Sequence, residues 1–149
     1  KSGYDLKEAI KEHLTEQGYI IDDVGTKDVE NPLPFYEAAQ NGARQIQERN
    51  HERGILICGT GMGVSIVANK HKGVHAAACE SVYAAEKARA INDANVLCMG
   101  GWLIAPIMGI AITEKFLQTS FTEGLEDWRA KNVTKARQII RDMEPKNFK

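Results

Sequence analysis

Residues 54–70 read GILICGTGMGVSIVANK, an apolar run that passes into a glycine-rich turn and then into a helix-forming stretch. A short apolar run bounded by glycine predicts a strand buried on both faces, as in parallel sheets that helices cover. Three glycines, Gly59, Gly61 and Gly63, alternate after the run and predict a tight turn. This segment therefore favours folds in which a buried parallel strand leads into a helix.

The rest of the chain alternates short apolar runs with longer amphipathic stretches, which is typical of a parallel sheet wound with helices. Further strands are expected at residues 19–24, 74–78 and 95–99, and helices at residues 4–17, 35–48, 82–91, 103–117 and 126–143, with a short helix from the glycine loop to residue 69. Residues 144–149 are expected to form a solvated tail. Since such units normally begin with a strand, about ten further residues carrying one are expected before residue 1. No linker or repeat divides residues 1–149, which predicts a single domain.

Charge and hydropathy exclude several classes of function. The formal net charge is −1, with acidic and basic residues interspersed, so a nucleic-acid partner is not expected. The longest apolar run, Trp102 to Ile112, is shorter than the roughly 20 residues that cross a bilayer, so a membrane partner is not expected either. The three cysteines form no CxxC pair and no even set, which indicates a reducing, cytoplasmic location.

Cys58 is the strongest candidate for a chemical role. It ends the buried strand, where open α/β sheets place their ligands, and it precedes a loop whose backbone amides and helix start favour a thiolate and bind an anion. A thiolate beside such a loop suits proton abstraction next to a carbonyl. A cysteine at a strand end more often only packs, and that is the interpretation preferred for Cys79 and Cys98. No histidine spacing indicates a metal site, and neither a metal nor a cofactor is expected.

A dinucleotide site is the main competing interpretation of the glycine loop. Glu80 lies about where a ribose-binding acid would stand. However, the glycines fall at Gly59, Gly61 and Gly63 instead of in a GxGxxG pattern, and the remaining chain is too short for a substrate domain. This interpretation is therefore less favoured.

The sequence resembles the family of type B ribose-5-phosphate isomerases and galactose-6-phosphate isomerase subunits over nearly its whole length. Three blocks in order carry the resemblance: residues 3–7 (GYDLK), residues 57–65 (ICGTGMGVS) with residues 68–70 (ANK), and residues 92–96 (NDANV) followed by Gly100-Gly101. The resemblance implies a Rossmann-like three-layer αβα sandwich with a five-stranded parallel sheet and a C-terminal helix. It also implies a homodimer or homotetramer whose active sites combine two subunits, and cofactor-free isomerisation through a cis-enediolate.

The resemblance also implies the site residues. In the family, the cysteine matching Cys58 is the base, the loop matching Gly59 to Ser65 binds the enediolate, and the asparagine matching Asn92 contacts sugar hydroxyls. The expected site thus has two catalytic residues, Cys58 and Thr60, and eight substrate-binding residues, Lys1, Gly59, Gly61, Met62, Gly63, Ser65, Asn92 and Arg129.

Departures from the family pattern concern the substrate. Ile91 stands at the position of the ring-opening histidine, Lys1 at that of another histidine, and Leu33 at that of an aromatic residue facing the sugar. Trp102 and Leu125 stand where arginines usually hold phosphate. We therefore expect an aldose-ketose isomerase for a small phosphorylated sugar other than ribose 5-phosphate. A non-catalytic module that binds a nucleotide or a sugar phosphate, and one subunit of a heteromeric isomerase, remain the alternatives.

Overall fold

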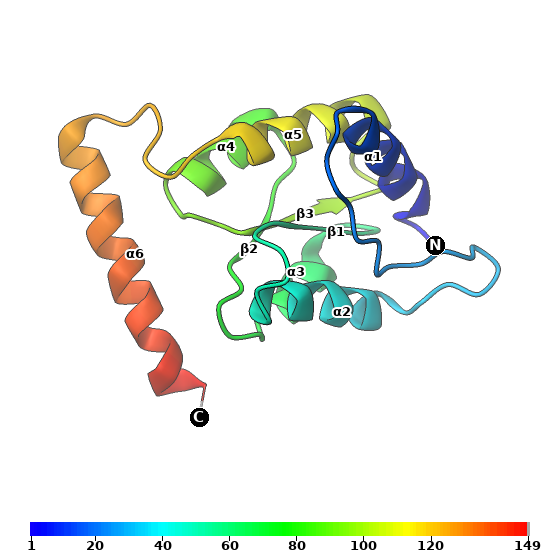
Figure 1. Ribbon diagram of the computed structural model, residues 1–149, viewed down its shortest axis with the longest axis horizontal. Helices are drawn as coiled ribbons and strands as arrows, with labels where there is room; N and C mark the ends of the chain where they lie inside the picture. Colours follow the sequence, from blue (N-terminus) through cyan, green and yellow to red (C-terminus); the bar gives the residue numbers. More distant parts are fainter. Residues whose placement is uncertain (149) are drawn as a thin grey trace.

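The computed structural model describes residues 1–148, which form an α/β sandwich (Figure 1). Its three strands are all parallel and lie in the order β1-β3-β2. Six helices accompany them. In chain order the elements are α1 (Tyr4–Glu16), α2 (Phe35–Gln47), β1 (Gly54–Cys58), α3 (Met62–Ala68), β2 (Ala76–Ala78), α4 (Val82–Ala90), β3 (Val96–Gly100), α5 (Pro106–Gln118) and α6 (Asp127–Asn147).

Helices cover both faces of the sheet. The side chains of the central strand, β3, therefore alternate between two buried cores. Leu97 and Met99 of β3 point into the core formed with α1, α4 and α5. Val96 and Cys98 point into the core formed with α2 and α3. All five residues of β3 are buried, so this strand is the centre of the molecule. Figure 1 shows the two helical layers on opposite sides of the sheet.

The expected five-stranded sheet included one strand before residue 1, and of the four strands expected within the chain, residues 1–148 form three. Residues 19–24, where a strand was expected, form none, because they exchange no ladder hydrogen bonds with a neighbouring strand. A groove of about 410 Å³ lies along β1. It is lined by residues 19–25, by β1 itself and by side chains of α1 and α2. The outer edge of β1 therefore faces this groove, and β1 pairs only with β3.

The parallel register places the amino ends of β1 and β3 at one edge of the sheet and their carboxyl ends at the opposite edge. Gly54 of β1 pairs with Val96 of β3, and Cys58 pairs with Gly100. Beyond the strands, the Gly101 N–H donates to the Cys58 carbonyl oxygen at 2.8 Å. Gly100 must be glycine, because a Cβ there would lie 2.6 Å from the backbone of Thr60. The loops after β1 and β3 are thus in contact at the carboxyl edge of the sheet.

Helix α6 stands apart from the sandwich and has no buried residue (Figure 1). It continues to Asn147, so the expected tail from residue 144 is wrong for residues 144–147, and residue 149 lies outside the described part of the chain. The Glu144 side chain anchors this end, since its Oε1 accepts a hydrogen bond from the Gly73 N–H at 2.6 Å. In residues 1–148 no helix has the length and apolar character needed to span a membrane.

Candidate active site

Cys58 lies at the carboxyl end of β1, and its sulfur is held by the loop that follows. The Gly61 N–H donates to Cys58 Sγ at a nitrogen to sulfur distance of 3.1 Å. Gly61 adopts a left-handed backbone with φ of 78°, which turns this N–H back towards the sulfur. A hydrogen bond to sulfur stabilises the thiolate, the form of cysteine that accepts a proton.

The other two cysteines lie inside the protein, as predicted. Cys79 and Cys98 are buried, whereas Cys58 is half-buried. Burial raises the pKa of the Cys79 thiol to about 11. Burial also raises the pKa of Cys98, and the nearby Cys58 and Cys79 thiols add to this effect. Both therefore remain neutral thiols at physiological pH, and Cys58 is the only one of the three cysteines that is not buried.

Hydrogen bonds between its own residues brace the glycine loop. Thr60 Oγ1 accepts a hydrogen bond from the Met62 N–H at 3.3 Å, which leaves the Thr60 hydroxyl proton free to donate. Ser65 Oγ donates to the Met62 carbonyl oxygen at 2.7 Å. The Met62 side chain is exposed. The loop is therefore ordered by its own polar side chains at the start of α3.

Two aromatic rings pack against the glycines of the loop, and the sequence interpretation missed both contacts. The Trp102 indole lies over Gly59, where a Cβ would come within 2.8 Å of the ring. The Phe35 ring lies over Gly63 at the same spacing. Trp102 is 73% exposed, so most of the ring borders the solvent beside the loop. In the sequence, only the alternating glycines indicated that another group packs against the loop, and they do not identify which side chain it is.

The amino-terminal segment also lies beside Cys58. Gly3 packs against Ile57, where a Cβ would lie 2.7 Å from the isoleucine side chain. The Ser2 carbonyl oxygen contacts Gly101. The structure thus places Lys1 and Cys58 along one groove.

Asn92 and Arg129 are not near Cys58 within one chain. Asn92 precedes β3 and so lies beyond the edge of the sheet opposite to Cys58. The four residue steps between those edges span about 13 Å at the usual strand rise. Arg129 is exposed in the first turn of α6 and packs over the Trp128 ring, 5.1 Å from its centroid. Within one chain, Asn92 and Arg129 are therefore separated from Cys58.

Substitution of Gly61 by alanine is expected to damage the site more than the same change at Gly18. Both glycines have a left-handed backbone, with φ of 78° at Gly61 and 87° at Gly18, but a Cβ at Gly61 would lie 2.8 Å from the Met99 backbone, whereas Gly18 faces open space. The shared backbone penalty is about 1–2 kcal/mol. The clash adds about 1–3 kcal/mol at Gly61 alone. Thermal unfolding measures the difference in stability.

Activity separates the two glycine variants further. Gly61→Ala moves the N–H away from Cys58 Sγ, and a displacement of this kind costs about 10²-fold in kcat/KM. Gly18→Ala should keep nearly wild-type kcat/KM, because Gly18 follows α1 and takes no part in the proposed site. Equal losses in both variants would contradict the role assigned to the Gly61 N–H.

Comparison with known proteins identifies relatives over almost the full chain. Residues 1–134 match the family described as Ribose/Galactose Isomerase. A 4-deoxy-4-sulfo-D-erythrose isomerase from Clostridium sp. (strain MSTE9) is 57% identical over 97% of this chain and 91% of the relative. A D-erythrulose-4-phosphate isomerase from Pectobacterium atrosepticum is 38% identical over 80% of this chain and 79% of the relative. The solved ribose-5-phosphate isomerase B of Clostridium thermocellum superposes with a TM-score of 0.81 at 33% identity, covering 95% of this chain and 93% of that one.

Proposed function

The chain belongs to the Ribose/Galactose Isomerase family and is a sugar isomerase, and on that premise we propose that it isomerises a four-carbon sugar with an anionic group at C4. The observation that carries this proposal is the 57% identity to an isomerase of 4-deoxy-4-sulfo-D-erythrose. A sulfonate is therefore the first candidate for the anionic group, and a phosphate is the second, as in the D-erythrulose-4-phosphate isomerase. Ribose 5-phosphate is not the proposed substrate.

We propose that Cys58 Sγ, as a thiolate, removes the proton from the carbon next to the carbonyl. The electrons of the broken C–H bond form the double bond of a cis-enediolate, and the carbonyl oxygen gains the negative charge. The loop from Gly59 to Ser65 faces that charge, with its backbone N–H groups and the Thr60 hydroxyl as donors. The hydroxyl proton of the carbon that lost its hydrogen passes to the former carbonyl oxygen, and the Cys58 thiol returns its proton to the former carbonyl carbon. The deprotonated carbon thereby becomes the new carbonyl, and the former carbonyl carbon carries a hydroxyl. The Gly61 N–H bond to Cys58 Sγ supports this role.

Ile91 supports a substrate that is already open-chain. A pentose 5-phosphate closes a ring through its C4 hydroxyl, and opening that ring needs an acid-base group. A four-carbon sugar substituted at C4 has no hydroxyl left to close a five-membered ring. Ile91 follows directly after α4 and has no group that transfers a proton. An enzyme with isoleucine at this position therefore suits the four-carbon substrate.

Substrate preference tests this proposal. The wild-type protein should convert 4-deoxy-4-sulfo-erythrose, or erythrulose 4-phosphate, with a kcat/KM at least about 10²-fold above that for ribose 5-phosphate. Nuclear magnetic resonance in deuterated water follows the reaction, because solvent deuterium enters next to the carbonyl. Ile91→His should raise only the pentose rate, and Ile91→Leu is the matched control. Efficient wild-type turnover of ribose 5-phosphate would contradict the four-carbon proposal.

We also propose that the protein is a homodimer or homotetramer, in which Asn92 and Arg129 of one subunit complete the site around Cys58 of another. The separation of these residues within one chain supports this arrangement. Exposed apolar side chains on α5 and α6 provide surface for contact between subunits, among them Ile107, Trp128, Ile139 and Ile140. We propose a cytoplasmic location, in keeping with three unpaired cysteines, and a single domain over the chain.

A further inference from the structure

Helix α6 is held to the rest of the chain by a few polar contacts along one face. Arg137 and Arg141 reach Asp93, and Glu144 reaches Gly73. These α6 residues are spaced i, i+4 and i+7, so they form a single stripe on the helix. Arg137 also lies over the Phe121 ring, 4.1 Å from its centroid. Because α6 buries no residue, these contacts determine where the helix stands.

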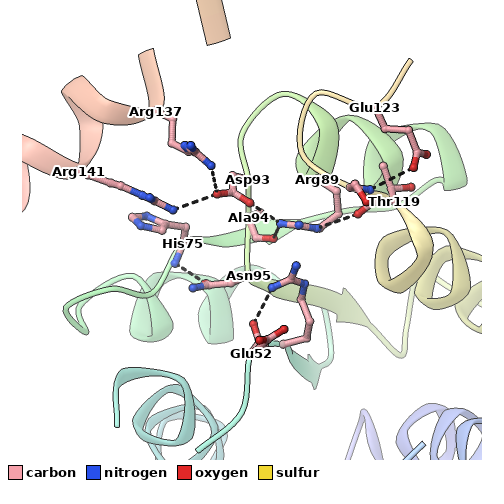
Figure 2. Close-up of polar contacts among 12 residues, drawn as sticks. Glu52, His75, Arg89, Asp93, Ala94, Asn95, Thr119, Glu123, Arg137 and Arg141 are labelled. Carbon is pink, nitrogen blue, oxygen red and sulfur yellow. Dashed lines mark hydrogen bonds and ion pairs between the residues drawn. The ribbon is translucent and has the colours of Figure 1, made fainter. Parts of the chain in front are cut away.

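The Asp93 carboxylate joins three arginines (Figure 2). Its Oδ2 accepts hydrogen bonds from Arg137 and Arg141, each at 3.0 Å. Its Oδ1 accepts one from Arg89, also at 3.0 Å. Partial burial opposes ionisation of Asp93, but the hydrogen bonds from Arg137 and Arg89 outweigh this effect and hold its pKa below the ordinary value. The carboxylate is therefore charged at physiological pH.

Arg89 fixes Asp93 to the body of the protein. This arginine is only 2% exposed, and it also donates to the carbonyl oxygens of Ala94 at 2.6 Å and Thr119 at 3.3 Å. A buried guanidinium needs such partners, because removing a charge from water is costly. Asp93 itself lies in a left-handed turn with φ of 51°. The carboxylate is thus a rigid point to which α6 is attached.

Asp93 connects two parts of the chain that the proposed function uses together. It is the neighbour of Asn92, and it holds the helix that carries Arg129. Arg129 precedes Arg137 by about 12 Å along the helix axis, so a small rotation at Asp93 moves Arg129 by a larger distance. We propose that Asp93 is a positioning residue that sets Arg129 relative to Asn92, so that both reach the substrate in the partner subunit's site. This inference rests on the proposed function.

The test separates α6 from Asp93 without disturbing the buried arginine. Asp93→Asn would leave Arg89 without its charged partner and could unfold the protein. The double variant Arg137→Gln/Arg141→Gln leaves the Arg89 to Asp93 pair intact. Its control is Lys131→Gln/Lys135→Gln, which removes the same charge at the same spacing from exposed residues of α6. Assays use 4-deoxy-4-sulfo-erythrose and erythrulose 4-phosphate.

The double arginine variant should raise KM by about 10- to 100-fold, with a smaller change in kcat, because the group that binds the anionic end is displaced. The lysine control should keep the wild-type KM. Arg129→Gln should raise KM by itself, and adding the double arginine change to it should raise KM little further, since both act on the same contact. A purely structural role for Asp93 predicts additive losses instead.

The outcomes distinguish this inference from the proposed function. If the wild-type protein isomerises neither four-carbon substrate, the proposed function is wrong and the inference falls with it. If the wild-type protein is active but the double arginine variant keeps its KM, or loses activity additively with Arg129→Gln, the inference alone is overturned. Non-additive effects on KM, together with an unchanged lysine control, support it.

Discussion

Replacing Cys58 by alanine is expected to abolish isomerisation and to leave the fold almost unchanged. The variant loses the only sulfur that the Gly61 N–H contacts, and with it the group that moves the proton. Loss of a general base costs about 10²- to 10⁴-fold in rate. The cost in stability is small, about 1 kcal/mol or less, because Cys58 is half-buried at a strand end and leaves little cavity. Initial rates on the four-carbon substrates and a thermal melt measure both effects.

The other two cysteines provide matched controls for this change. Cys79→Ala and Cys98→Ala remove the same atom from buried positions, so they should lower the unfolding temperature more than Cys58→Ala does. Both should keep most of the activity, because neither thiol lies at the glycine loop. If Cys58→Ala retained a tenth of the wild-type rate on the true substrate, Cys58 would not be the base.

Mixing two inactive variants is expected to restore activity, because each site is proposed to combine two subunits. One variant is Cys58→Ala, and the other is Asn92→Ala/Arg129→Gln, which removes the half of the site proposed to come from the partner. The second variant should lose about 10²-fold or more, since it gives up hydrogen bonds to the sugar and to its anionic end. A mixed dimer holds one complete site, so random reassembly should recover about a quarter of the wild-type activity.

The control for this experiment is the Cys58→Ala protein taken alone through the same unfolding and reassembly, which should stay inactive. Co-expression of the two variants with different tags tests the same point without refolding, since the mixed dimer can be purified by both tags. A purified mixed dimer with no activity above its parents would show that Asn92 and Arg129 serve the Cys58 of their own chain. The shared-site proposal would then be wrong.

The sequence by itself determined the parts of this protein that rest on local pattern. Strand β1 matches the predicted residues 54–58, and most helices begin within a residue or two of their predicted positions, since apolar periodicity and glycine stops act over a few residues. The same reasoning assigned Cys79 and Cys98 to the core. The glycine loop was recognisable because it contains three alternating glycines, which have no side chain and so allow close packing that other residues prevent. The fold class and Cys58 as the candidate base followed from these features.

The tertiary structure decided what depends on residues far apart in the chain. Residues 19–24 have the composition of a strand but form none, because within residues 1–148 they exchange no ladder hydrogen bonds with another strand. No spacing rule predicted that Trp102 and Phe35 would cover Gly59 and Gly63.

The role of Asp93 was equally invisible, because its partners Arg137 and Arg141 lie 44 and 48 residues away. The strand register alone showed that Asn92 and Cys58 occupy opposite edges of the sheet. Local propensity selects each element, but only packing determines which side chains meet.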